Sequence, residues 1–441
     1  MSPEFIPLEQ QAERAYLVGV ELRQARPLLS VHDSLAELAL LADTAGIEVL
    51  GQTSQKLDRV HPSTFVGSGK IEEVKEAMQE LGANVVIFDD ELSPRHQREL
   101  ENIFGEETKV LDRSALILDI FAQHAQTHEG RLQIELAQYE YRLPRLTRQW
   151  THLARQAGGG SARGGSGGVG LRGPGETQLE VDRREISRRI SKLKAELEQV
   201  RAHRSRHRQQ RDKTGMPVIA LVGYTNAGKS TLMRTLTHEE VYVANQLFAT
   251  LDTTTRRISL PNGKATLIAD TVGFIQKLPT MLIAAFRATL EGITEADLLL
   301  HVVDSSHPNM WQQIETVEDT LAEIEVPDIP RILVLNKVDQ PSALTIEDNH
   351  PIHGEYNAVV KVSALKGDGI AELLTTIEQV FKEAMVSVKL FLPYREGEMI
   401  NWLHSRGVVQ SEEHTETGVK MEVHVPERDL ARVQRYELHN T

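Results

Sequence analysis

Residues 218–231 read VIALVGYTNAGKST, an apolar run followed by a glycine-containing loop and the start of a helix. Successive backbone amides of such a loop can hold phosphate oxygens, and the helix adds its positive N-terminal end. Lys229 would neutralise the β and γ phosphates, and the Ser230 hydroxyl would bind Mg²⁺. The stretch therefore predicts a phosphate loop in a doubly wound α/β domain, with contacts from Gly223, Tyr224, Thr225, Asn226, Ala227, Gly228, Lys229 and Ser230.

Three further motifs follow in order, each at the end of an apolar run. In DTVG (270–273), Asp270 could reach Mg²⁺ through water, and the Gly273 amide could contact the γ-phosphate. In NKVD (336–339), the Asp339 carboxylate matches the two N–H groups of guanine, a pairing that adenine cannot make. The predicted nucleotide contacts are Asp270, Thr271, Val272, Gly273, Asn336, Lys337, Val338, Asp339, Ser363, Ala364 and Leu365. The set indicates GTP, converted to GDP, rather than ATP.

The chain upstream and downstream of this domain shows other patterns. Strand-like runs at 16–22, 47–52, 84–90 and 109–113 alternate with amphipathic segments, which predicts a parallel α/β sheet. VGSGK (66–70) is expected to be a turn that opens a helix, because its spacing is not that of a phosphate loop. We predict four domains: an N-terminal α/β domain (1–115), a helical hairpin (116–213), a P-loop GTPase domain (214–386) and a small α+β domain (387–441).

The hairpin is predicted from two heptad seams on either side of a glycine-rich stretch, residues 158–175. The first seam runs from Leu132 to Leu153 and the second from Leu179 to Val200, which favours antiparallel packing with the glycines at the tip. Residues 142–213 hold 18 Lys and Arg against 7 Asp and Glu, a local charge of +11 in a chain of −14, so the rest carries −25. Such a surface suits the phosphates of RNA.

Composition excludes several classes of protein. With 441 residues and 40% hydrophobic side chains, the chain can bury a large core, and no apolar run is long enough to span a bilayer. No membrane association is expected, and with no export signal and no cysteine, we predict a monomeric cytoplasmic protein.

These motifs together resemble the translation-factor-related P-loop GTPases. Within that class, GYTNAGKSTL, QLFATLDTTTRR, ADTVGFIQKLP and GLRGPGETQLEVDRR are similar to stretches of the HflX family, as are FVGSGK and THEGRLQIELAQ. The resemblance covers about residues 10–385, and the tail is similar only loosely. It implies a GTPase that binds the large ribosomal subunit and its RNA through the hairpin and splits stalled ribosomes when GTP is bound.

The resemblance also assigns a switch threonine within FATLD (248–252). It implies that Thr250 binds Mg²⁺ together with Ser230, whereas the chemistry of the residues alone leaves Thr253, Thr254 and Thr255 open. The implied catalytic residues are Lys229, Thr250 and Gly273. The further nucleotide contacts that it implies are Phe248, Ala249, Leu251 and Asp252.

Phe274 occupies the position after DTVG where many GTPases carry a glutamine that orients the attacking water. Phenylalanine cannot form a hydrogen bond, so hydrolysis should be slow unless the ribosome or another factor stimulates it. Some related GTPases with such a replacement recruit K⁺ through an asparagine in the phosphate loop. Asn226 matches that place, and its alternative role is to stabilise the loop.

The basic helix supplies the expected RNA contacts. Its default interpretation is a solvated face, but one sign of charge dominates, which favours RNA. The predicted RNA-binding residues are Arg163, Arg172, Arg183, Arg184, Arg188, Arg189, Arg204 and Arg208.

Three alternative functions share some of these features. A GTP-switched regulatory protein acting on another protein would leave ribosome binding incidental. A tRNA-modifying GTPase of the related family needs a C-terminal cysteine, which this chain lacks. An ATP-driven RNA remodeller would have to depend on VGSGK, although some ATP turnover is compatible with the sequence.

Overall fold

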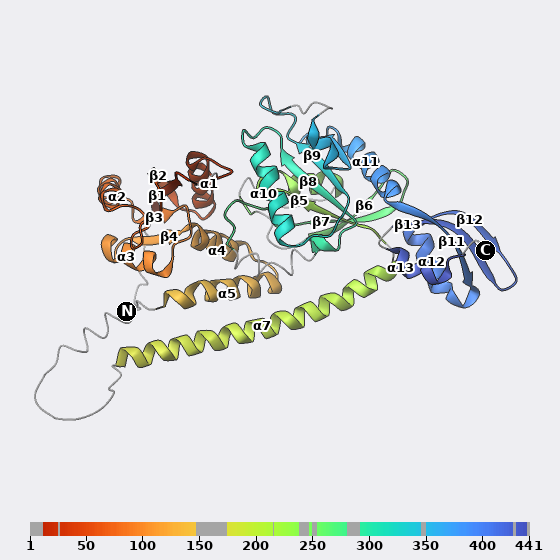
Figure 1. Ribbon diagram of the computed structural model, residues 1–441, viewed down its shortest axis with the longest axis horizontal. Helices are drawn as coiled ribbons and strands as arrows, with labels where there is room; N and C mark the ends of the chain where they lie inside the picture. The colour runs from red at the N-terminus through yellow and green to blue at the C-terminus, as the bar shows by residue number, and fades with distance from the viewer. Residues whose placement is uncertain are drawn as a thin grey trace, which may run out of the picture. The chain divides into compact units, whose positions relative to one another are not determined.

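The computed structural model describes residues 12–24, 27–146, 174–214, 216–237, 247–248, 254–279, 292–344, 350–426 and 429–438; of these, the side chains of 174–179, 201, 203–214 and 406 are not described. The chain forms two compact units (Figure 1). The first contains Met1–Leu197 and Lys277–Ala285, and the second contains Glu198–Gln276 and Phe286–Thr441.

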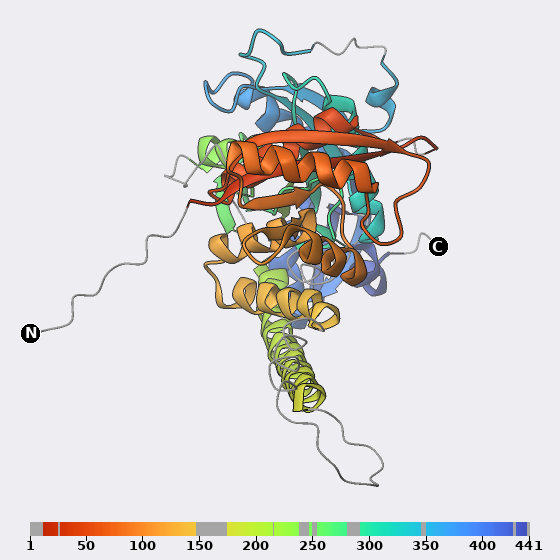
Figure 2. The same cartoon turned by 90° about the vertical axis from the view of Figure 1, so that its left-hand side faces the viewer.

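The first unit is built on a four-stranded sheet. Its strands are β1 (Arg14–Leu22), β2 (Glu48–Leu57), β3 (Val85–Phe88) and β4 (Lys109–Asp112), in the order β2-β1-β3-β4. All three pairings are parallel, as the alternation of apolar and amphipathic segments predicted. The long strands β1 and β2 appear in red in Figure 2.

Helices cover both faces of this sheet (Figure 1). Helices α2 (Ser68–Leu81) and α3 (Pro94–Phe104) pack on the face that carries Val18 and Val86. Helices α1 (Val31–Thr44) and α4 (Arg113–His124) contact β1 and β4 and each other. VGSGK is a turn that opens α2, as expected, and its Lys70 pairs with Glu73 at 2.7 Å.

In the first unit, one further helix lies beside the N-terminal part of a long helix whose residues from Glu198 onward belong to the second unit. Helix α5 (His128–Arg142) is followed by the short 3₁₀ helix η1 (Leu143–Arg145), and α7 extends over Pro174–Thr214. Arg189 Nη2 pairs with Glu135 at 2.7 Å and Lys194 Nζ pairs with Glu140 at 2.9 Å, so these ion pairs join α7 to α5. Leu193 and Leu197 of the predicted second seam are buried.

The beginning of the predicted hairpin segment, 116–213, contains parts of two helices, α4 and α5. Ala125 is extended, and the Thr127 hydroxyl accepts a hydrogen bond from the Gly130 amide, so α4 ends and α5 begins with its own N-cap. The rest of the predicted first seam, beyond Leu146, and the glycine-rich stretch lie outside the described residues.

The second unit contains a six-stranded sheet of order β10-β9-β8-β5-β7-β6. Its strands are β5 (Val218–Val222), β6 (Thr254–Ser259), β7 (Ala265–Asp270), β8 (Leu298–Asp304), β9 (Arg331–Asn336) and β10 (Ala358–Lys361). Only β6 is antiparallel to its neighbour.

Helices pack on both faces of this sheet. Helices α8 (Lys229–Thr237) and α11 (Ile370–Glu383) contribute Leu232 and Leu373 to the core on one face, and α10 (Met310–Glu323) contributes Ile314 on the other. A 3₁₀ helix, η2 (Pro351–Gly354), precedes β10. The parallel strands place the loops that follow β5, β7, β9 and β10 at one edge of the sheet.

The C-terminal residues form an antiparallel sheet of order β11-β13-β12. Its strands are β11 (Met385–Pro393), β12 (Val408–His414) and β13 (Gly418–Pro426). Helix α12 (Gly397–Arg406) packs Trp402 and Leu403 against it, and the short η3 (Tyr394–Glu396), α13 (Leu430–Val433) and η5 (Gln434–Tyr436) complete the domain. This is the α+β arrangement that the sequence of residues 387–441 predicted.

Within the described part of the chain, no helix combines the length and the apolar character needed to cross a bilayer.

Candidate functional site

The phosphate loop connects β5 to α8, and two of its glycines are sterically required. Gly223 has φ +149°, and a Cβ there would lie 2.2 Å from the Val302 carbonyl oxygen. Gly228 has φ +95°, and its Cβ would lie 2.2 Å from Asn336 Nδ2. These φ values favour glycine, so the backbone can wrap closely around phosphate only with these residues.

Lys229 begins α8 and is buried under the loop. Its Nζ donates to the carbonyl oxygens of Gly223 at 2.9 Å and Tyr224 at 2.8 Å. An ammonium group has three donors, so one remains for a phosphate oxygen. Burial lowers the pKa of Lys229 to about 8, and Asp270 acts in the opposite direction.

Ser230 and Asp270 meet beside Lys229. The Ser230 hydroxyl donates to Asp270 Oδ2 at 2.8 Å, and Asp270 itself is 1% exposed at the end of β7. Hydroxyl and carboxylate oxygens are the hard donors that Mg²⁺ prefers. The pair therefore fits the predicted metal position. The third predicted ligand, Thr250, lies outside the described residues with Ala249, Leu251 and Asp252.

DTVG and the residues after it pack against the phosphate loop. The Thr225 amide donates to the Phe274 carbonyl at 2.7 Å, and the Phe274 amide donates to the Gly223 carbonyl at 3.1 Å. A Cβ on Gly273 would lie 2.9 Å from Thr225 Cα and 3.0 Å from Lys229 Nζ. Thr271 is fixed by its hydroxyl, which donates to the Leu221 carbonyl at 2.6 Å.

The Phe274 side chain is 2% exposed, so it is directed into the protein interior and offers no hydrogen bond to water. Its backbone, by contrast, pairs with Tyr224 in a parallel bridge. Val272 and Phe248 are also buried.

The NKVD and SAL motifs meet behind the phosphate loop. Asn336 Nδ2 donates to the Ala227 carbonyl at 2.9 Å, and its Oδ1 accepts from the Ala364 amide at 3.0 Å. Asn336 thus braces the phosphate loop against the SAL turn, while the Lys337 ammonium pairs with Asp304 at 2.6 Å.

Asp339 is the last residue of the NKVD motif and is half-buried. Its Oδ1 accepts from the Ser363 hydroxyl at 2.7 Å, and this hydrogen bond lowers the pKa of Asp339, which keeps the carboxylate ionised. Val338 is half-buried next to it, and Leu365 is 70% exposed. An ionised carboxylate held in this way can accept two hydrogen bonds from guanine.

Asn226 is exposed at the tip of the phosphate loop with φ +59°. Asparagine tolerates this left-handed conformation better than most residues, so the local backbone alone favours it.

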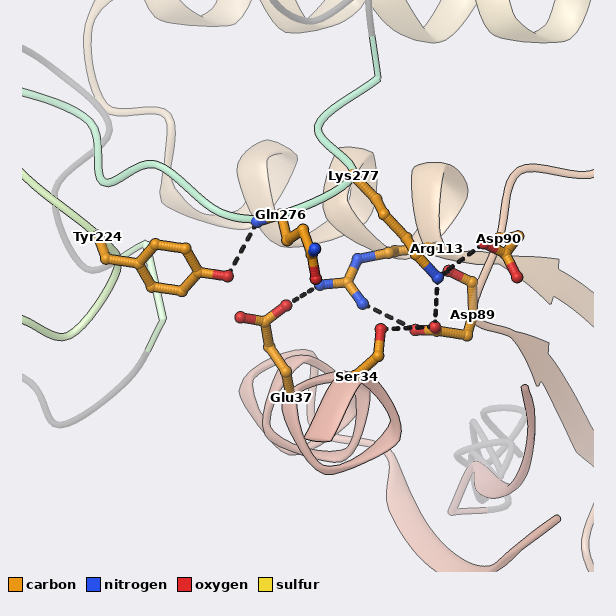
Figure 3. Close-up of polar contacts among 8 residues, drawn as sticks. All are labelled: Ser34, Glu37, Asp89, Asp90, Arg113, Tyr224, Gln276 and Lys277. Atoms are coloured by element: carbon orange, nitrogen blue, oxygen red, sulfur yellow. Dashed lines mark hydrogen bonds and ion pairs between the residues drawn. The ribbon is translucent and has the colours of Figure 1, made fainter. Parts of the chain in front are cut away.

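Tyr224 has a structural role that the sequence did not predict: its hydroxyl accepts a hydrogen bond from the Gln276 amide at 2.9 Å (Figure 3). No motif spacing signals that contact.

The predicted RNA-binding arginines divide into three groups. Arg183, Arg184 and Arg188 are exposed on α7 and form no hydrogen bond or ion pair with any described residue. Arg189 is half-buried in its ion pair with Glu135. Arg163 and Arg172 lie outside the described residues, as do the side chains of Arg204 and Arg208.

A phosphate loop, DTVG, NKVD and SAL, gathered at one edge of this six-stranded sheet, define a P-loop GTPase. Family models match the chain over residues 32–122 ("GTP-binding GTPase N-terminal"), 124–211 ("GTP-binding GTPase Middle Region"), 218–337 ("50S ribosome-binding GTPase") and 352–438 ("HflX C-terminal domain").

Relatives cover nearly the whole chain. The GTPase HflX of Lacrimispora saccharolytica is 43% identical over 424 residues, and that of Escherichia coli is 42% identical over 431 residues, each covering 96% of both chains. The chain belongs to the HflX family, and it binds GTP and hydrolyses it. Among solved structures, a GTP-binding protein from Sulfolobus solfataricus in complex with GDP is 23% identical, with a TM-score of 0.44, over 83% of this chain and 98% of that one.

Proposed function

We propose that the GTP-bound protein binds the large ribosomal subunit through the basic part of α7 and separates stalled ribosomes into subunits. The observation that carries this proposal is the free arginine cluster, Arg183, Arg184 and Arg188. The three guanidinium groups are exposed and are not used by any described residue, whereas Arg189 and Lys194 of the same helix are paired with α5.

The free arginine cluster is suited to binding the phosphates of RNA. Arginine binds phosphate in a bidentate manner, and each phosphate neutralised releases counterions. The matching family model that is described as a 50S ribosome-binding GTPase supports the large subunit as the target. In this proposal the nucleotide sets the affinity for the ribosome, while α7 supplies contact with its RNA.

The first experiment measures co-sedimentation with large subunits in the presence of a non-hydrolysable GTP analogue. Replacing Arg183, Arg184 and Arg188 with Gln should weaken binding and reduce the slope of log K against log salt by about 2, at roughly 0.7 per phosphate contact. The affinity for GTP should not change. A matched control replaces the exposed Arg59, Arg95 and Lys382 with Gln, the same loss of charge on other elements.

Equal loss of binding in both variants would show that only net charge matters. Binding that is the same with GDP as with the GTP analogue, and that survives the cluster variant, would contradict the proposal. That outcome would favour a GTP-switched regulatory protein acting on another protein.

We also propose that K⁺ stimulates hydrolysis through Asn226. Phe274 supplies no hydrogen bond to the attacking water, and Asn226 is exposed at the loop tip where a cation could bridge it to phosphate. Turnover should be faster in potassium than in sodium at equal ionic strength, and Asn226→Gly, which keeps the left-handed backbone, should abolish the difference. Equal turnover of the unaltered protein in both salts would contradict this proposal.

A further inference from the structure

The lysine of the NKVD motif is held by a carboxylate from the neighbouring strand. Lys337 Nζ lies 2.6 Å from Asp304 Oδ2, and Asp304 is the last residue of β8, where it pairs with Asn336 of β9. The two side chains are 29% and 13% exposed, so this ion pair is partly shielded from solvent and less screened than a pair on an open surface. All of these residues belong to the second unit of the chain.

Asp304 is itself held in one orientation by the turn that follows it. Its Oδ1 accepts hydrogen bonds from the Ser306 amide at 3.0 Å and from the Ser306 hydroxyl at 2.6 Å. Between them, Ser305 donates its amide, at 3.0 Å, and its hydroxyl, at 2.7 Å, to the Asn336 carbonyl. The turn thus fixes one carboxylate oxygen and is itself joined to the NKVD motif, which leaves the other oxygen for Lys337.

The position of the Lys337 ammonium group decides which part of this side chain can serve the nucleotide. Lys337 has φ +65°, a left-handed conformation that persists for a residue with a Cβ where the surroundings fix it. Because its charge is already paired with Asp304, the methylene stem remains to pack along a flat apolar surface. Asp339 follows two residues later and carries the carboxylate that matches the edge of guanine, and the face of that ring is such a surface.

We propose that Asp304 is a positioning residue for the guanine base: it holds Lys337 so that the lysine stem covers one face of the ring while Asp339 binds its edge. Asp304 does not touch the nucleotide, and the phosphates are bound by Lys229 instead. The contribution of Asp304 to affinity is therefore the same for GTP and GDP, because both carry the same base. This inference rests on GTP binding and on the predicted guanine contact of Asp339, and it is independent of the proposed ribosome function.

The test measures the dissociation constants of the full-length protein for GDP and for a non-hydrolysable GTP analogue, together with kcat and KM for GTP. Asp304→Asn keeps the shape of the side chain and an oxygen for Ser306, but removes the charge that holds the lysine. Both affinities should fall by the same factor, about fivefold, the scale of one hydrogen bond. KM should rise by that factor while kcat stays unchanged, because the chemistry at the γ-phosphate is not affected.

The split between KM and kcat separates positioning from damage to the fold. A misfolded fraction lowers kcat and the number of binding sites per chain, whereas the dissociation constant of the folded fraction stays the same. Lys337→Met keeps an unbranched stem but has no charge to pair with Asp304, and it should reduce both affinities by a similar factor. The double variant with Asp304→Asn should lose no more than either single variant, since both break the same contact.

The matched control is Asp319→Asn, which removes the same charge from an exposed position on α10 and should leave both dissociation constants unchanged. The proposal is overturned if Asp304→Asn binds both nucleotides as tightly as the unaltered protein. A loss for the GTP analogue that differs from the loss for GDP would also overturn it, as would fully additive losses in the double variant.

Discussion

Lys229 illustrates how one buried charge can make nucleotide binding depend on pH. Burial lowers the pKa of the free lysine to about 8, and a bound phosphate favours its charged form. Below that pKa the lysine is already charged, so GTP affinity should be nearly constant. Above it, binding must take up a proton, and the affinity should fall, approaching tenfold per pH unit.

The affinity for GTP can be measured between about pH 7 and pH 9 by calorimetry in two buffers that differ in ionisation enthalpy. Proton uptake should grow as the pH rises through the pKa of Lys229. A constant affinity with no proton uptake over this range would show that Lys229 is charged in the free protein throughout.

At the residue scale, the sequence predicted the side chains whose role follows from a local motif. The backbone geometry at Gly223 and Gly228 tolerates little else, and the side chain of Lys229 donates to the carbonyl oxygen of Gly223. The contact between Lys277 and Asp89 (Figure 3) could not be predicted, because the two residues are 188 positions apart in the chain. Such a contact depends on folding and not on spacing.

At the scale of elements, strands were easier to predict than the ends of helices. The four apolar runs of the N-terminal domain each became a strand of a parallel sheet. The inner strands β1 and β3 are largely buried, which explains their apolar runs. The division between α4 and α5 was not predicted, because it depends on the extended backbone of Ala125 and on the Thr127 cap, which the heptad seam does not show.

Helix α7 shows a second limit of what the sequence can predict. Its excess of arginine was visible, but the count of charges could not separate Arg188 from Arg189. Only packing against α5 does so: Arg188 is exposed, whereas Arg189 binds Glu135 through Nε at 2.9 Å and Nη2 at 2.7 Å. The element thus contains both structural arginines and arginines available to a partner.

For the molecule as a whole, the average charge conceals two different surfaces. The net charge of −14 gives no reason to expect RNA binding, yet residues 142–213 carry +11 and the rest carries −25. An acidic surface repels RNA, so in the proposed function the basic segment is the part that approaches it. In the proposed function, the nucleotide bound at the GTPase site sets whether this approach takes place.

The most direct test of this account is sedimentation of intact ribosomes with the full-length protein and a non-hydrolysable GTP analogue. We predict that the intact-ribosome peak decreases while free large and small subunits increase, and that GDP produces no such change. The protein, expected to be a monomer, should migrate with the large subunits. An intact-ribosome peak that is unchanged by the GTP-bound protein would contradict the account.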